Sequence, residues 1–343
     1  MASGTLTPFI SVFVVLMVVG GVGNVGLLVS VRGDHARAPL QQLLLLPDLV
    51  VVHLGVACLL HALSGGVSLL VTATVCCQEL ADGFCGTINF LIRYGSTLGG
   101  WFTLLLSLYR YAKLRTLDRP SLAVTRLEGA TWPRRCCSLL WAAIALVLSP
   151  TVWSAISARS SFYTATTAMS SASTNASSTN STTNSTTSSS SISVCKLNAC
   201  PCVSADSAVL QQYWTVVNYV FVWLPVALML LSNAQMVRQL WRHRRSVDAE
   251  SNLGAAVVLL TVAVYVGCKG AIGAGLAASF IRGSAAPPLP GVSLFMSISG
   301  PLFPALCPYL ILAGDSKKRD ALLEALRVAP RRSQEERRGA GED

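Results

Sequence analysis

The sequence has little charge for its length. Asp, Glu, Lys and Arg make up 12% of the 343 residues, whereas ordinary globular domains carry about a quarter. Hydrophobic residues make up 52% and form runs of about 20 or more, long enough to cross a hydrocarbon core of about 30 Å as helices. The low charge content and the long apolar runs together exclude a water-soluble domain. A membrane barrel would show short alternating strands instead, so we predict spanning helices, whose backbone hydrogen bonds are satisfied internally.

The patterns that enzymes and metalloproteins need are also missing. The sequence has no phosphate-binding glycine loop, zinc-ligand spacing or nucleophile motif. Its four histidines are scattered between the membrane runs and the inner connections: His35, His53, His61 and His243. Asp and Glu do not cluster at membrane depth. We therefore expect no catalytic residues, no metal and no cofactor.

The apolar runs predict an all-α, seven-transmembrane helix bundle in residues 1–314. The expected helices are 9–31, 45–73, 86–110, 135–156, 212–240, 252–281 and 290–313. A six-helix alternative would need the second run to fail, because Pro47, Asp48 and Gly65-Gly66 interrupt it. The first run has no basic segment before it and exceeds a signal-peptide core, so it should remain in the mature protein.

Residues 315–343 form the predicted cytoplasmic end. The segment DSKKRDALLEALRV should form a short amphipathic helix at the membrane interface, with Leu322, Leu323 and Leu326 on its apolar side. A basic tail follows. Membrane anchoring is the simpler role for this helix.

The distribution of basic residues predicts the orientation. Most of the 26 Lys and Arg fall in 32–37, 110–135, 238–245 and the tail, and such residues are retained on the cytoplasmic side. The N-terminus should then be extracellular in a multi-pass plasma-membrane protein. Attraction to anionic inner-leaflet lipid accounts for the net charge of +10, so no nucleic-acid partner is expected.

The long connection 157–210 supports the same orientation. It is rich in Ser and Thr and has too few apolar side chains to form a packed structure. Three acceptor sequons begin at Asn175, Asn180 and Asn184. They can be glycosylated only on the lumenal side, where the charge distribution places them.

The eleven cysteines divide according to this topology. Six are expected outside: Cys76, Cys77, Cys85, Cys195, Cys200 and Cys202. Six cysteines allow 15 connectivities. We favour a bond from Cys85 to Cys195, which would fasten the loop over the bundle, with Cys200 and Cys202 as alternatives. Simple apolar packing is expected for the others, which are Cys58, Cys136, Cys137, Cys268 and Cys307.

Several landmarks resemble the rhodopsin-like G-protein-coupled receptors. They are Gly23-Asn24, Trp141, Pro150, Pro225 and Pro308. Arg110 also follows Cys85 at the family's spacing between its disulfide cysteine and the arginine ending the third helix. The resemblance implies a heterotrimeric G protein as partner, contacted through Tyr109, Arg110 and Tyr111.

Other positions depart from the mainstream of that family. Tyr109 replaces an acidic residue and Cys58 the sodium-site aspartate, while VYVGCKG and LCPYLIL replace CWxP and NPxxY. The second, third and seventh helices instead resemble the vomeronasal type-1 and fish olfactory receptor class A-like branch. The segments are LLPDLVVVHLGVACLL, IRYGSTLGGWFTLLLSLYR and LFPALCPYLILAGD, with Ser96 where the branch has a second arginine. A chemosensory receptor for odorants or pheromones is implied.

Two cationic residues lie within apolar runs and are candidates for ligand binding, Arg93 and Lys269. Asn89, Arg93 and Thr97 share one helical stripe, and Tyr265 precedes Lys269 by one turn. We predict an outer-half pocket for a small ligand, with anionic molecules as candidates. Alternatively, both cations snorkel or bond to backbone carbonyls.

A small transporter or channel is the alternative function. Glycine-rich segments such as 20–23 and 267–275 suit close packing in any helical bundle. Transporters are often built from repeated halves. The sequence shows no convincing repeat, and an odd helix number argues against equal halves.

Overall fold

The computed structural model describes residues 3–37, 46–74, 82–118, 131–150, 213, 216–217, 219–242, 249–282, 290–324 and 326. These residues form long α-helices, with no strand among them. The helices are α1 (Ser3–Arg37), α2 (Leu46–Thr74), α3 (Asp82–Asp118), α5 (Thr131–Leu148), α8 (Leu224–Arg242), α9 (Ala249–Arg282) and α10 (Pro290–Gly314). A π-helical segment, η2 (Tyr219–Trp223), precedes α8, and a short helix, Ser316–Glu324, follows α10.

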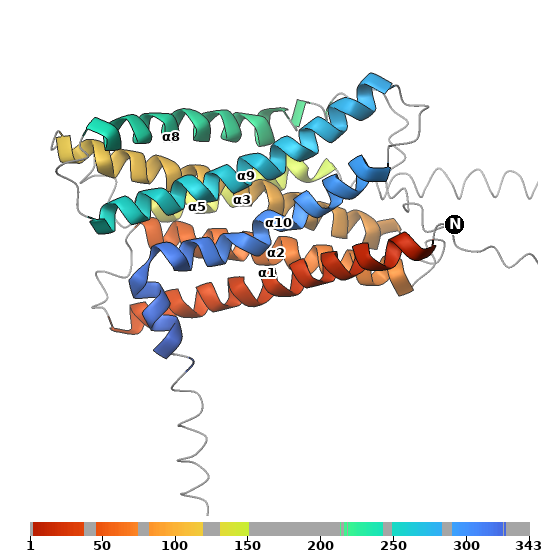
Figure 1. The fold of residues 1–343 in the computed structure, drawn as a ribbon, viewed down its shortest axis with the longest axis horizontal. Helices are drawn as coiled ribbons and strands as arrows, with labels where there is room; N and C mark the ends of the chain where they lie inside the picture. Colours follow the sequence, from red (N-terminus) through yellow and green to blue (C-terminus); the bar gives the residue numbers. More distant parts are fainter. Residues whose placement is uncertain are drawn as a thin grey trace, which may run out of the picture.

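The helices run side by side, and consecutive ones alternate in direction (Figure 1). α3 lies in the middle of the bundle and contacts α2, α5, α8 and α9. α10 packs against α1, α2 and α9. The core is formed by apolar side chains from all these helices, including Leu27, Leu54, Leu98 and Ile144, none of which is exposed.

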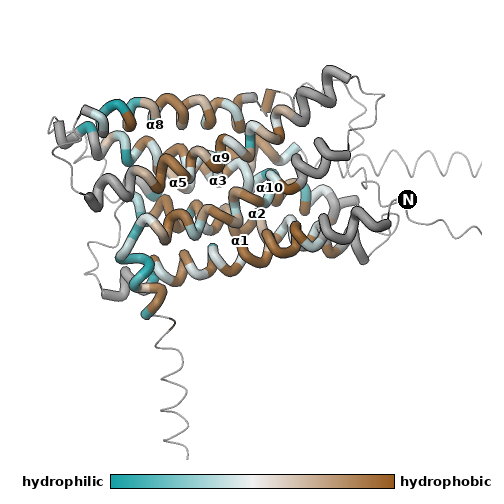
Figure 2. Tube along the Cα trace, in the orientation of Figure 1, coloured by the Kyte–Doolittle hydropathy of each residue, from teal (hydrophilic) through white to brown (hydrophobic). Residues whose placement is uncertain are grey.

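Four helical segments are long and apolar enough to cross a membrane by length and composition. They are Ser11–Gly33, Pro47–Ser68, Val220–Gln239 and Ala256–Ala274. A fifth is added if Ile298–Gly314 and Ser316–Glu324, which meet at a bend of 101°, count as one span. Figure 2 shows apolar midsections and hydrophilic residues where α10 meets the short helix. The all-α class of a helical membrane protein is confirmed, and the count of seven spans stays a prediction.

Each of the seven expected ranges overlaps a helix of the structure. The second run does not break, because Pro47 lies in the first turn of α2, where a missing N–H costs no helical bond. α2 then continues through Gly65 and Gly66 to Thr74. The reason for the six-helix alternative is thereby removed.

Prolines inside the helices leave backbone carbonyls without their usual donor four residues later. Pro225 lacks the N–H that would bond to the Phe221 carbonyl, and Trp101 of α3 supplies its Nε1–H at 3.2 Å instead. This bond lies at the π-helical segment, and such bulges often accompany local breaks in the helical ladder. It fastens η2 to α3.

Two further carbonyls are satisfied in the same way. Pro308 frees the Pro304 carbonyl, which accepts a hydrogen bond from Asn24 Nδ2 of α1 at 3.0 Å. Pro150 frees the Leu146 carbonyl, which accepts one from Ser149 Oγ at 2.8 Å. A lipid interior offers no water to these carbonyls, so side chains must replace the lost N–H groups.

A double-mutant cycle tests the pairing of Asn24 with the Pro304 carbonyl. Asn24→Leu should lower the free energy of unfolding by about 1–3 kcal/mol, because it leaves a buried acceptor unsatisfied. In a Pro308→Ala background the cost should be smaller, since residue 308 can then donate to that carbonyl. Unfolding of the four proteins in detergent measures the coupling. Additive effects would show that Pro308 does not create the need for Asn24.

Candidate functional site

Lys269 on α9 places a half-buried ammonium inside the helix bundle. Its Nζ donates a hydrogen bond to Ser96 Oγ on α3 at 2.6 Å and lies 5.6 Å from the centroid of the Tyr265 ring. A cavity opens beside this bond, lined by residues of α2, α3, α9 and α10. They include Cys58, Ser96, Tyr265, Lys269, Ser299 and Phe303.

The cavity is small in this conformation. Its volume, taken as the space for the centre of a water-sized sphere, is about 10 Å³, and a single water needs roughly 10–15 Å³ on that measure. The cavity therefore has room for one particle of about that size. A larger ligand requires the surrounding helices to separate.

Glycines on α3 bring α2 close to the cavity. A Cβ on Gly95 would lie 2.8 Å from the Ala57 carbonyl oxygen and 2.9 Å from the backbone nitrogen of His61. Both distances are shorter than real Cβ contacts, so no residue with a side chain can replace Gly95 unless the helices shift. The α2–α3 contact behind the cavity thus depends on Gly95.

His61 lies at this α2–α3 contact, next to Gly95, and was not among the predicted site residues. Its side chain is buried, and its Nδ1 lies 2.9 Å from the Ile92 carbonyl oxygen. No local sequence pattern marks His61, because its partner carbonyl lies on another helix, 31 residues away in the chain.

The predicted pocket residues separate into two groups. Tyr265 and Lys269 line the cavity, and the Tyr265 ring packs edge-on against Phe303 at 4.9 Å between centroids. Thr97 is buried, Asn89 is partly buried and Arg93 is exposed, and none of the three lines the cavity. The α3 residue that Lys269 contacts is Ser96, which the sequence marked only as a departure from a family pattern.

Aromatic contacts fix α5 against α2 and α3 beside this region. Trp141 donates its Nε1–H to His53 Nδ1 at 3.1 Å, so that nitrogen of His53 must be the unprotonated one. Tyr94 donates its hydroxyl to the Trp141 carbonyl at 2.8 Å. The His53 ring stacks on Phe102 with 5.4 Å between centroids.

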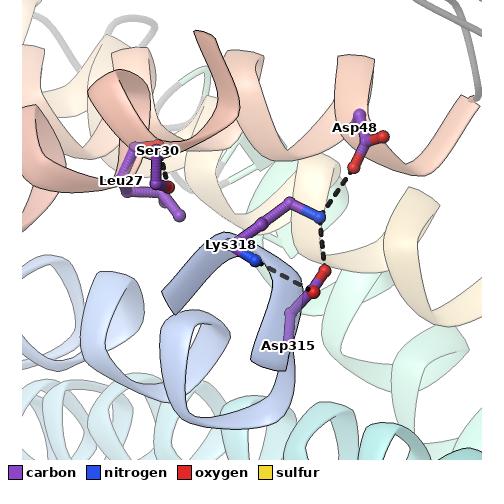
Figure 3. Close-up of polar contacts among 5 residues, drawn as sticks. All are labelled: Leu27, Ser30, Asp48, Asp315 and Lys318. Carbon is purple, nitrogen blue, oxygen red and sulfur yellow. Dashed lines mark hydrogen bonds and ion pairs between the residues drawn. The ribbon is translucent and has the colours of Figure 1, made fainter. Parts of the chain in front are cut away.

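A second polar cluster lies at the end of the bundle where α10 meets the short helix (Figure 3). Lys318 is buried, and its Nζ lies 2.8 Å from Asp48 Oδ1 at the start of α2. The same ammonium contacts Asp315 Oδ2. The Lys318 backbone N–H also donates to Asp315 Oδ1 at 3.3 Å, so Asp315 caps the short helix. One lysine thereby joins α2 to the bend after α10.

The charges in this cluster shift the pKa of both central groups. Burial alone would raise the pKa of Asp315, but the hydrogen bonds and charge of Lys318, together with the charge of Arg110, hold it below 3.8. Burial would lower the pKa of Lys318, but Asp48 and Asp315 raise it above 10.5. Each shift favours the charged form and therefore stabilises the fold.

Arg110, toward the C-terminal end of α3, lies close enough to Asp315 to act on that carboxylate. Its Nε is buried and has no hydrogen-bond partner within the described residues. Tyr109 and Tyr111 beside it are partly buried. The predicted G-protein contact residues thus lie next to the Lys318 cluster.

The remaining predicted sites are described only in part. Cys85 lies in α3, but its side chain, Cys195 and the sequons at Asn175, Asn180 and Asn184 fall outside the described residues. The inner cysteines are free thiols, and Cys58, Cys137, Cys268 and Cys307 are buried. Leu322 packs against the core, whereas Leu323 and Leu326 are exposed.

No family model matches the chain, and no curated protein matches it in sequence. The membership of a receptor family therefore stays a prediction that rests on the sequence landmarks.

Replacing Lys318 should show how far its cluster stabilises the fold. Lys318→Met leaves two carboxylates without their shared cation and should cost about 3–5 kcal/mol. The difference from wild type in unfolding free energy should be fully present at neutral pH. It should shrink in acid, because burial, no longer opposed by Lys318, raises the pKa of Asp315 in the variant. It should also shrink in alkali, as the pH rises through the raised pKa of Lys318.

Unfolding temperatures of the purified protein across this pH range provide the measurement. Lys317→Met is the matched control, because Lys317 is the preceding residue and is exposed. A difference between wild type and Lys318→Met that is already lost at neutral pH would contradict the ionic account.

Proposed function

We propose that this chain is a G-protein-coupled chemosensory receptor of the plasma membrane, with seven spanning helices and an extracellular N-terminus. A small ligand, of which small anions are one class, binds in the outer half of the bundle. The observation that supports this most directly is the Lys269 ammonium beside a small cavity between four helices. An ionisable group held inside a membrane bundle is a functional candidate by default.

The contacts of α9 and α3 suggest how ligand binding at Lys269 is linked to the end of the bundle where Arg110 lies. A ligand that accepts hydrogen bonds from Lys269 competes with Ser96 and so acts on the contact between α9 and α3. Arg110 ends that same α3 beside Asp315. A ligand shifts the helices only by binding one arrangement more tightly than another, and widening the cavity supplies that difference.

Ligand recognition can be tested with a panel of small carboxylic acids as probes. Lys269→Gln should weaken the potency of active acids about tenfold or more, since a hydrogen bond to a charged group contributes about 1.5–3 kcal/mol. Arg93→Gln should have a smaller effect, because Arg93 is exposed. Potency and its pH dependence are measured by concentration–response in cells. If both stay unchanged in both variants, the anionic pocket is wrong.

Coupling to a G protein is tested by ligand-dependent nucleotide exchange in cells that express the receptor. Arg110→Gln should abolish the response, because the family resemblance assigns this residue to the G-protein contact. Arg115→Gln, an exposed cation near the end of the same helix, is the matched control and should retain it. Cell-surface labelling confirms equal expression. A ligand-driven substrate flux without nucleotide exchange would favour the transporter.

A further inference from the structure

Lys269 has no acidic residue at its depth in the bundle. The sequence contains no Asp or Glu in 49–78, 83–117 or 251–314, which include the segments of α2, α3, α9 and α10 around the cavity. The contacts of Lys269 within the described chain are the Ser96 hydroxyl and the Tyr265 ring. Its positive charge therefore has no protein counter-charge nearby.

This imbalance distinguishes Lys269 from Lys318. Lys318 is buried beside two carboxylates, Asp48 and Asp315. A buried charge is costly unless it is paired, and the cost is higher within a bilayer. A hydroxyl and an aromatic face orient an ammonium but do not neutralise it. A counter-ion from solution would supply the missing negative charge.

The hydrogen-bonding groups at the cavity favour an anion. The ammonium of Lys269 has three N–H donors and uses one on Ser96 Oγ. Because Ser96 accepts that bond, its own O–H remains available to donate into the cavity. Donors from α9 and α3 thus converge on one space, and an occupant must accept from both.

The size of the cavity restricts the anion further. With room for about one water-sized particle, it excludes carboxylates attached to a larger body unless the helices move. A monatomic halide, slightly larger than a water molecule, is the anion that comes nearest to this size. A water molecule would also fit, but it would leave the Lys269 charge uncompensated.

We propose that Lys269 and Ser96 bind a halide ion, chloride under physiological conditions, in the cavity between α2, α3, α9 and α10. The site shares Lys269 with the proposed ligand pocket but does not depend on G-protein coupling. The halide holds α9 against α3 when no ligand is present. A ligand that reaches Lys269 must displace it.

The test compares the thermal stability of the purified full-length protein in sodium chloride and in sodium gluconate, at equal ionic strength and pH. Gluconate is too large for the cavity. The unfolding temperature should rise by several degrees with chloride and saturate, because a ligand of the native state stabilises it by mass action. Bromide should substitute for chloride.

Two variants locate the effect. Lys269→Met should abolish the chloride dependence, whereas Ser96→Ala should raise the half-effective chloride concentration about tenfold, as expected for one lost hydrogen bond to an ion. Ser96→Ala also provides an answer if Lys269→Met does not fold. Lys317→Gln, an exposed lysine outside the cavity, should behave as wild type.

Equal stability of the wild type in chloride and gluconate would overturn the proposal. A chloride dependence that persists unchanged in Lys269→Met and Ser96→Ala would also overturn it, because the ion would then bind elsewhere. Chloride-dependent stability without any G-protein response would contradict the receptor function and leave the halide site standing.

Discussion

The absence of water inside the bilayer imposes one constraint on every helix that spans it: a backbone carbonyl that loses its helical N–H must find another donor. Among the carbonyls that prolines free in the described helices, three accept a hydrogen bond from a side chain. The carbonyl–donor pairs are Leu146 with Ser149, Phe221 with Trp101, and Pro304 with Asn24. Two of the pairs join different helices. The prolines therefore determine where the bundle is fastened, as well as where its helices bend.

Buried charge is subject to the same constraint. At one end of the bundle, Lys318 bonds to two carboxylates and lies near Arg110, so positive and negative groups balance. At the cavity, Lys269 bonds to a hydroxyl alone. Both sites involve α3, through Ser96 and Arg110, which are about four turns apart and thus near the same face of the helix. A shift of α3 changes both sites, which gives a physical route for coupling between them.

The sequence predicted the helices well because long apolar runs and prolines carry that information locally. It also paired Tyr265 with Lys269 correctly, since one helical turn separates them. It could not choose between the α3 stripes containing Arg93 and Ser96, because lipid-facing and buried positions of a membrane helix are both apolar. The contact of the buried Lys318 with Asp48 could not be predicted from the sequence either. That contact joins residues far apart in the chain and depends on the 101° bend after α10.

The hydrogen bond between Lys269 and Ser96 is where the proposed binding and conformational change coincide. Beside the small cavity, the ammonium joins α9 to α3, and in our proposal it also binds an anion. An anionic ligand larger than a halide can satisfy Lys269 only by widening the cavity, so its binding energy is coupled to helix separation. A halide satisfies the charge without separation. Two anions that bind the same lysine would thus favour opposite arrangements of the helices, and their relative occupancy would set the fraction of open bundles.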